Sequence, residues 1–196
     1  MKAGTTTIVR QGGFTIIELM ITVVLMAILA SLAAPSFTGM IVTTRISGQV
    51  NDLVGSINLA RSEAVKRNNG VTICQSSDGT SCGGETDWST GWIVFSDPDV
   101  DAAVASSADI VRVFPAMSSS TTAVFDGTTS SITFIGLGRP LGTFTGTFVK
   151  ICPPQGGDYC RYICINSQGR PRVDTPAQYA ADSICGAGSG VGGIGH

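Results

Sequence analysis

Two arginines near the C-terminal end of the sequence, Arg170 and Arg172, have a type and spacing suited to binding phosphate groups. In an extended chain, side chains two residues apart point to the same side at about 6.5–7 Å, close to the spacing of successive phosphates along one DNA strand. Gly169 permits a turn and Pro171 limits backbone freedom, so the pair would be held out stiffly. Because the planar arginine fork contacts phosphate oxygens bidentately, the segment is a candidate DNA-binding site.

The basic residues around this segment would strengthen its attraction for a polyanion. Five bases and one acid lie between residues 139 and 172, although the whole chain has a formal charge of −2. The bases are Arg139, Lys150, Arg161, Arg170 and Arg172. The alternative is a strand-end turn with solvated charges, because Gly138-Arg139-Pro140 repeats the sequence Gly169-Arg170-Pro171. We expect DNA binding.

Catalytic and cofactor chemistry finds no support in the sequence. The single histidine is the last residue, and neither a Gly-x-Ser-x-Gly nucleophile turn nor a P-loop is present. Asp97, Asp99 and Asp101 are spaced like ligands of a calcium loop, but the glycine turn and closing glutamate of such a loop are missing. We therefore expect a solvated acidic loop, and neither enzyme activity nor a bound cofactor or metal.

Six cysteines lie outside the apolar N-terminal segment: Cys74, Cys82, Cys152, Cys160, Cys164 and Cys185. An even number of cysteines in a small, loop-rich domain predicts disulfides and an oxidising compartment. Zinc is the alternative, but no C-x2-C spacing and no internal histidine are present. Of the fifteen pairings that six cysteines allow, we favour Cys74–Cys82, Cys152–Cys160 and Cys164–Cys185.

A carboxylate interrupts the apolar segment near the N-terminus. Residues 14–34 are apolar except for Thr, Ser and Glu18, and at about 1.5 Å per residue they are long enough to span a bilayer core. An unpaired carboxylate in lipid is costly, so Glu18 needs a partner. Cleavage between Gly13 and Phe14 would create an α-amino group that could pair with Glu18 of a neighbouring chain. An uncleaved anchor, the alternative, leaves Glu18 without this partner.

The elements that must position these residues are one long helix and a series of strands. Apolar residues recur every three or four positions from Val42 to Ala64, and Asn68-Asn69-Gly70 predicts the helix end. Short β-rich runs separated by turns then predict strands at 71–74, 91–95, 110–114, 123–125, 131–134, 147–152 and 159–165. We expect an α+β fold with the long N-terminal helix packed on antiparallel β-sheet.

The predicted elements divide the chain into five segments. Residues 1–13 are a leader peptide that is cleaved, 14–34 a transmembrane and assembly helix, and 35–69 its amphipathic continuation. Residues 70–185 form a disulfide-stapled, β-rich globular domain, and 186–196 form a flexible glycine-rich tail.

The sequence from Gly13 to Glu18, Gly-Phe-Thr-Ile-Ile-Glu, resembles the cleavage site of type IV prepilins and type II secretion pseudopilins. The resemblance implies that a prepilin peptidase cuts after Gly13 and methylates the new N-terminal Phe14. Three later runs, at 60–74, 88–97 and 132–140, are similar to the GspH/FimT group of minor pilins and pseudopilins, and most of all to FimT. These resemblances imply a pilin-like fold.

FimT-type minor pilins have a Gly-Arg-x-Arg motif near the C-terminus and are linked to DNA capture during natural transformation. The similarity of residues 169–172 to this motif implies a minor pilin of a type IV pilus that binds extracellular double-stranded DNA without sequence preference. The alternatives are a FimU-like minor pilin that primes assembly without binding DNA, and a GspH-like pseudopilin of a type II secretion system.

The resemblance also implies partners and a location. The expected partners are other pilins of the filament, the prepilin peptidase, the inner membrane before assembly, and double-stranded DNA. The expected location is the bacterial inner membrane, as a single-pass protein with a periplasmic domain, and then the extracellular pilus.

Overall fold

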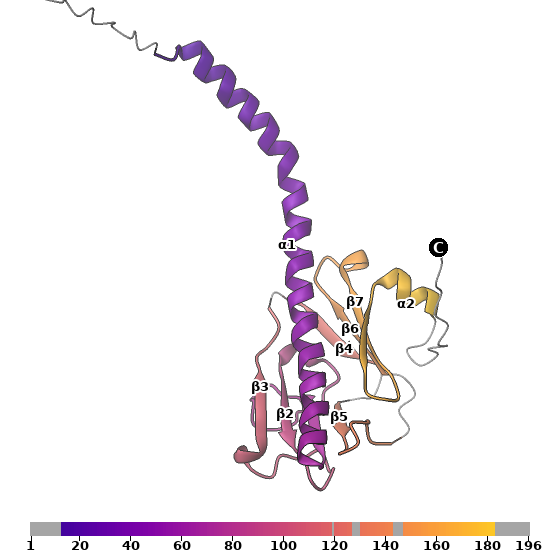
Figure 1. The fold of residues 1–196 in the computed structure, drawn as a ribbon. Coiled ribbons are helices and arrows are strands. Elements are labelled where there is room, and N and C mark those ends of the chain that lie inside the picture. Colours follow the sequence, from indigo (N-terminus) through magenta and orange to yellow (C-terminus); the bar gives the residue numbers. More distant parts are fainter. Residues whose placement is uncertain (1–12, 119, 127–129, 143–146, 183–196) are drawn as a thin grey trace, which may run out of the picture. The chain divides into compact units, whose positions relative to one another are not determined.

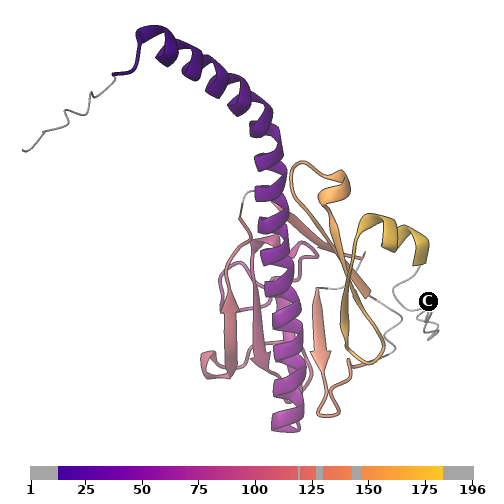
Figure 2. The same cartoon turned by 45° about the horizontal axis from the view of Figure 1, so that its top comes forward.

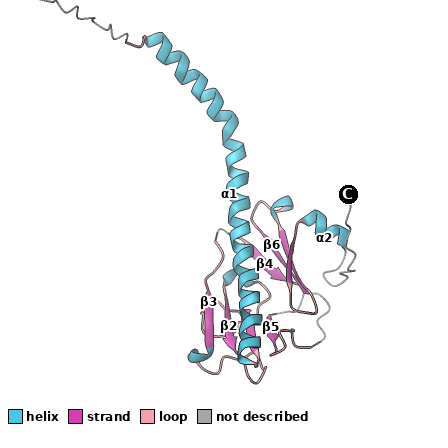
Figure 3. Cartoon of the chain, in the orientation of Figure 1, coloured by secondary structure: helices cyan, strands magenta, loops and turns pink. Residues whose placement is uncertain are grey.

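The structure, a computed structural model, describes residues 13–118, 120–126, 130–142 and 147–182 (Figure 1). The chain divides into two compact units, Met1–Ile41 and Val42–His196, and helix α1 contributes residues to both. The helices are α1 (Ile16–Arg67) and α2 (Pro176–Asp182), and the strands are β1 (Val71–Gln75), β2 (Trp92–Ser96), β3 (Ile110–Phe114), β4 (Thr122–Phe125), β5 (Ser131–Phe134), β6 (Thr147–Cys152), β7 (Arg161–Ile165) and β8 (Pro171–Asp174) (Figure 3).

In the N-terminal unit, Thr15 caps α1. Its side-chain oxygen accepts a hydrogen bond from the backbone N–H of Glu18 at 3.3 Å, and Glu18 lies in the first turn, where negative charge stabilises the helix. The Thr-x-x-Glu spacing is the sequence signature of a capping box. The helix therefore begins just after the predicted cleavage position.

The apolar side chains of this unit are exposed in the single chain, including Phe14 at 82%, Ile16 at 80% and Met26 at 71%. Of the helices that the structure describes, none is both long enough and sufficiently apolar to cross a membrane. The span predicted at 14–34 is therefore not confirmed.

In the second unit, α1 buries the apolar stripe that its sequence predicts. The buried residues are Ile46, Val50, Leu53, Ile57, Ala60 and Ala64. The helix ends where Asn68 adopts a left-handed φ of +49° and the N–H of Asn69 donates to the carbonyl of Ala64 at 3.2 Å. The predicted stripe and the predicted helix end are confirmed.

Two antiparallel four-stranded sheets complete the second unit. Their strand orders are β3-β2-β1-β5 and β4-β6-β7-β8, and α1 packs on both (Figures 1 and 2). Trp92 and Phe134 of the first sheet share one core with Phe125 and Ile163 of the second and with Leu53 of the helix. Each such side chain contributes about 1.5–3 kcal/mol when fully buried. The predicted α+β fold, with a long helix on antiparallel sheet, is confirmed.

All seven predicted strands are present with small shifts at their ends, but the sequence reading omitted β8 and α2. β8 begins at Pro171 and lies at the edge of its sheet, where a missing N–H is tolerated. Thr175 and Gln178 form a capping box around Pro176: the N–H of Thr175 donates to Oε1 of Gln178 at 2.9 Å, and the N–H of Gln178 donates to Oγ1 of Thr175 at 3.4 Å.

Two of the predicted disulfides, Cys74–Cys82 and Cys152–Cys160, are confirmed, with S–S distances of 2.03 and 2.08 Å. Cys164 is disulfide-bonded as well. Its predicted partner Cys185 lies outside the described residues, as do residues 1–12 of the predicted leader and the predicted tail at 186–196.

Candidate nucleic-acid interface

The segment from Gly169 to Arg172 forms the end of the β7–β8 turn and the start of β8. Asn166 organises this turn, because its Oδ1 accepts hydrogen bonds from two turn N–H groups, including that of Arg170 at 2.9 Å. Gly169 has a φ of +73° and donates its N–H to the carbonyl of Asn166 at 2.8 Å. A Cβ atom at Gly169 would lie 2.6 Å from Cε1 of Phe134. Only glycine fits here, as the sequence predicted for a turn.

The two arginines of the segment have different surroundings. Arg170 is exposed and forms no ion pair with any residue that the structure describes. Arg172 is 52% exposed, and its Nη2 lies 2.8 Å from Oδ2 of Asp174, a buried carboxylate two residues along the same strand. Arg172 would have to share its guanidinium between Asp174 and a phosphate, whereas Arg170 has no such competitor among the described residues.

Arg161 lies at the far end of the β7–β8 hairpin. At about 3.3 Å per residue, the length of β7 separates Arg161 from the turn by roughly 13 Å. Arg161 is half-buried, and its guanidinium donates to the carbonyls of Asp158 and Cys160 at 2.8 and 2.7 Å. Its described contacts therefore hold the β6–β7 connection, and the structure does not bring it to the Gly169–Arg172 segment.

Lys150 lies on β6 and is exposed on the outer face of the second sheet. It pairs with Tyr162 of β7, which in turn pairs with Asp174 of β8, so Lys150 and Arg172 lie on the same face of the sheet in adjacent rows. Tyr162 stacks on Tyr179 of α2 at 4.0 Å between ring centroids. Lys150 therefore lies on the second sheet itself, and Arg170 lies in the turn between β7 and β8.

Arg139 is exposed on the turn that follows β5. In this turn the N–H of Ile135 donates to the carbonyl of Arg139 at 3.0 Å, and Nε of Arg61 donates to the carbonyl of Gly138 at 2.9 Å. Gly169 packs against this turn, since its Cβ would lie 3.1 Å from Cδ of Pro140. The structure brings Arg139 and Arg170 to neighbouring turns.

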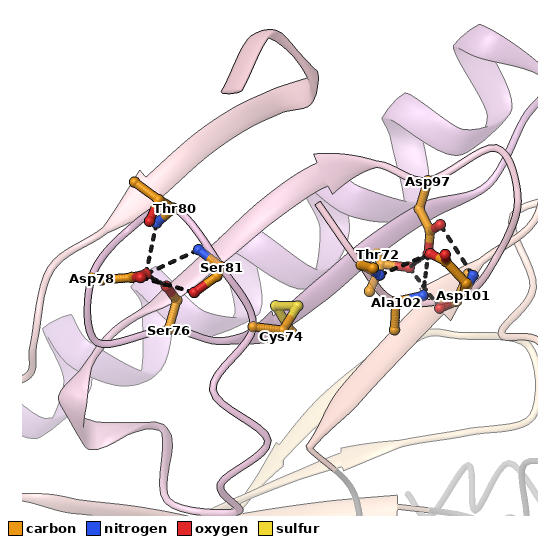
Figure 4. Close-up of a disulfide and its surroundings, with 12 residues drawn as sticks. Thr72, Cys74, Ser76, Asp78, Thr80, Ser81, Asp97, Asp101 and Ala102 are labelled. Atoms are coloured by element: carbon orange, nitrogen blue, oxygen red, sulfur yellow. Dashed lines mark hydrogen bonds between the residues drawn. A yellow bond between two sulfur atoms is a disulfide. The ribbon is translucent and has the colours of Figure 1, made fainter. Parts of the chain in front are cut away.

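Asp97 is buried, so the expectation that it is solvated is wrong. Its carboxylate accepts hydrogen bonds from the Thr72 hydroxyl at 2.6 Å and from the N–H groups of Asp101 and Ala102 at 3.2 and 3.1 Å (Figure 4). Burial is tolerated because these donors replace water. No cluster of three or more His, Cys, Asp or Glu residues that could hold a metal is present in the described part of the chain.

Asp78 organises the loop closed by the Cys74–Cys82 disulfide (Figure 4). Its carboxylate accepts hydrogen bonds from the N–H groups of Thr80 and Ser81 at 2.8 and 2.9 Å. These bonds, led by that from Thr80, hold the pKa of the Asp78 carboxyl well below its usual range. This acid also has a structural role.

The reading from sequence missed two residues that position the candidate interface, Asn166 and Arg61. Asn166 had a local signal, because asparagine commonly folds its side chain back onto a turn backbone. Arg61 had none, because its partner Gly138 is 77 residues away along the chain.

A helix with a capped N-terminus whose later part packs on two antiparallel, disulfide-bonded sheets defines a pilin-like subunit. Residues 49–169 match the family model described as type II transport protein GspH, and the chain belongs to this family. Residues 8–34 match the prokaryotic N-terminal methylation motif, which indicates a membrane-anchored pilin precursor. Pilins and pseudopilins are structural proteins that assemble with other subunits of a filament.

The fold is similar to that of the type IV minor pilin FimU of Pseudomonas aeruginosa strain PAO1, in two crystal forms. The first comparison gives a TM-score of 0.55 at 20% identity and covers 69% of this chain and 95% of that chain. The second gives 0.54 at 20% identity, with coverages of 67% and 98%. A comparison with curated proteins finds no match. The predicted likeness to FimT in particular is not confirmed.

Proposed function

We propose that this chain is a minor pilin of a type IV pilus that binds extracellular double-stranded DNA, without sequence preference, during natural transformation. The observation that carries the proposal is the exposed Arg170 on a turn held by Asn166 and by the close packing of Gly169. A guanidinium on a fixed backbone loses less conformational freedom when it binds than one on a mobile loop. Phosphate contacts of this kind supply most of non-specific DNA affinity.

Local charge supports DNA as the partner. The whole chain is slightly acidic, so long-range attraction alone would not favour a polyanion. At physiological salt the screening length is only about 8 Å, so the bases close to a phosphate dominate its binding. Arg170, Arg172 and Arg139 lie on the β7–β8 hairpin and the turn beside it, which supplies such a local cluster.

The N-terminal segment supports processing by a prepilin peptidase. Thr15 caps a helix that starts at Ile16, so Gly13 and Phe14 precede the helix, and Gly13 has open space around it. We propose cleavage after Gly13 and methylation of Phe14, with Glu18 pairing with the new amine of a neighbouring subunit. Before assembly the protein would be held in the inner membrane with a periplasmic domain, and afterwards it would be part of the extracellular pilus.

Two other functions are each favoured by one observation. The fold similarity to FimU favours a structural or priming minor pilin that does not bind DNA. The match of residues 49–169 to the GspH family favours a pseudopilin of a type II secretion system. Both share the helix and sheets of the leading proposal, and they differ from it in DNA binding.

The proposal is tested with the double variant Arg170→Gln, Arg172→Gln in a naturally transformable host. Cells with the double variant should assemble normal numbers of pili and take up labelled DNA poorly. Arg112→Gln removes an exposed base from β3 of the other sheet and is the matched control, for which uptake should stay near that of the wild type. Normal uptake by the double variant would exclude this segment as the DNA site and favour the structural minor pilin.

A further inference from the structure

Two turns of this fold share the sequence Gly-Arg-Pro and the same backbone hydrogen bonds. One is Ile135-Gly-Leu-Gly-Arg-Pro140, after β5, and the other is Asn166-Ser-Gln-Gly-Arg-Pro171, between β7 and β8. The N–H of Gly138 donates to the carbonyl of Ile135, and the N–H of Gly169 donates to the carbonyl of Asn166, both at 2.8 Å. In each, the first residue donates its N–H to the arginine carbonyl, at 3.0 and 3.2 Å. Both turns therefore present an arginine from the same backbone position.

The two turns pack directly on each other. A Cβ atom at Gly169 would lie 2.6 Å from Cε1 of Phe134, 3.1 Å from Cδ of Pro140 and 3.3 Å from the carbonyl oxygen of Gly138. The turns belong to different sheets, and both views of the chain show them side by side (Figures 1 and 2). Because the backbones are in contact at the residues just before Arg139 and Arg170, the distance between the two arginine backbones is fixed.

Helix α1 holds the first turn in place. Nε of Arg61 donates to the carbonyl of Gly138 at 2.9 Å, and Gly138, with a φ of +70°, lies so close to Val65 that an added Cβ would be 2.9 Å from Cγ2 of that side chain. The two turns are thus attached to the helix, to the first sheet and to the second sheet. A surface fixed at three elements presents its charges with little loss of conformational entropy on binding.

Arg139 and Arg170 are better able than Arg172 to accept a new partner. Both are exposed, and neither forms an ion pair within the part of the chain that the structure describes. Arg172, by contrast, lies 2.8 Å from the buried carboxylate of Asp174. Breaking that pair would leave Asp174 without its charged partner, which is costly for a buried acid.

We infer that Arg139 and Arg170 together form one phosphate-binding surface, termed the twin-turn surface, and that Arg172 contributes less. This inference rests on the proposed DNA-binding function and specifies which bases make the contact. The partner is the phosphate backbone of double-stranded DNA. It is contacted by residues from both β-sheets rather than by residues along a single β-strand. Arg61 is a positioning residue, since it acts on the first turn without reaching the ligand.

The test measures the binding of a labelled DNA duplex to the full chain in a non-ionic detergent over a series of salt concentrations. Four single variants are compared with the wild type: Arg139→Gln, Arg170→Gln, Arg172→Gln and the control Arg112→Gln. Arg139→Gln and Arg170→Gln should each lower the slope of log affinity against log salt by about 0.9, the loss of one phosphate contact. Arg172→Gln should lower it by less than half of that amount, and Arg112→Gln should leave it unchanged.

The outcomes separate this inference from the function on which it rests. If the wild type does not bind DNA in a salt-sensitive way, both the proposed function and the twin-turn surface are wrong. If the wild type binds, and Arg170→Gln and Arg172→Gln weaken binding while Arg139→Gln does not, the function stands and the twin-turn surface is refuted. Arg139→Lys should keep most of the salt slope, and a full loss in this variant with unchanged folding would also count against a phosphate contact.

Discussion

Nε of Arg61 on helix α1 donates a 2.9 Å hydrogen bond to the carbonyl oxygen of Gly138, 77 residues further along the chain. This bond fixes the turn that presents Arg139 to the helix. Gly138 is buried, so its carbonyl has little access to water that could replace the guanidinium.

We predict that Arg61→Gln lowers the free energy of unfolding by about 1–3 kcal/mol, because a charge-assisted bond to a buried carbonyl is lost. Urea unfolding followed by circular dichroism measures this change. Arg67→Gln on the same helix is the control, since Arg67 pairs with Glu63 at the surface and should contribute at most about 1 kcal/mol. Equal effects of the two variants would show that the Gly138 contact adds nothing to stability.

Substitution of Asp97 should lower the free energy of unfolding more than substitution of most other acids in the domain. Asp97→Ala removes the acceptor for the N–H groups of Asp101 and Ala102 and one of the two hydrogen-bond partners of the Thr72 hydroxyl, which also contacts Thr133. We expect a loss of about 2–4 kcal/mol in the free energy of unfolding. Asp99→Ala, at an exposed position in the same loop, should stay within about 0.5 kcal/mol of the wild type. A small effect at Asp97 would contradict its structural role.

The stability of the loop closed by the Cys74–Cys82 disulfide should depend on pH through the ionisation of Asp78. Hydrogen bonds from Thr80 and Ser81 favour the ionised carboxylate, so the pKa of Asp78 is lower in the folded protein than in the unfolded chain. Its contribution to stability is present above the unfolded pKa, at about 3.9, and is lost as pH falls through the folded pKa. An NMR titration of Asp78 should show a midpoint below that of the same residue in urea. A midpoint equal to that of the unfolded chain would disprove the assignment.

The N-terminus of the protein in filaments should be Phe14. Mass spectrometry of filament-associated protein should show the loss of residues 1–13 and one added methyl group, and a retained leader would overturn the pilin precursor reading. Glu18→Ala should still insert into the membrane, because it removes a charge, but should enter filaments poorly because the amine of Phe14 loses its partner. Normal incorporation of Glu18→Ala would show that this pairing is dispensable.

Much of the fold is predictable because it depends on short-range patterns. The spacing of Ile46, Leu53 and Ile57 specifies the buried face of α1, and the separation of Cys74 from Cys82 suits a short disulfide loop. Thr15 and Thr175, each followed three residues later by Glu or Gln, are local sequence signals for the starts of α1 and α2.

The candidate site was less predictable, because it depends on contacts between distant parts of the chain. The sequence singles out Arg170 and Arg172, but the ion pair of Arg172 with Asp174 needs the side-chain geometry of an edge strand. The second copy of Gly-Arg-Pro, at residues 138–140, favoured the alternative of a strand-end turn without a binding role. The packing of Gly169 on Pro140 nevertheless brings the two turns together. Arg161 is close to the segment along the chain and lies at the other end of its hairpin.

The most direct test of the central claim, that this minor pilin binds DNA through exposed arginines, is the salt dependence of DNA binding by the wild-type chain. We predict that log affinity for a duplex of arbitrary sequence falls linearly with log salt, with a slope of about −0.9 for each phosphate contacted. The double variant Arg170→Gln, Arg172→Gln should retain a small fraction of the affinity and remain folded, with a lower unfolding temperature because buried Asp174 loses its charged partner. Binding that is absent, insensitive to salt, or equal in the wild type and the double variant would contradict the account.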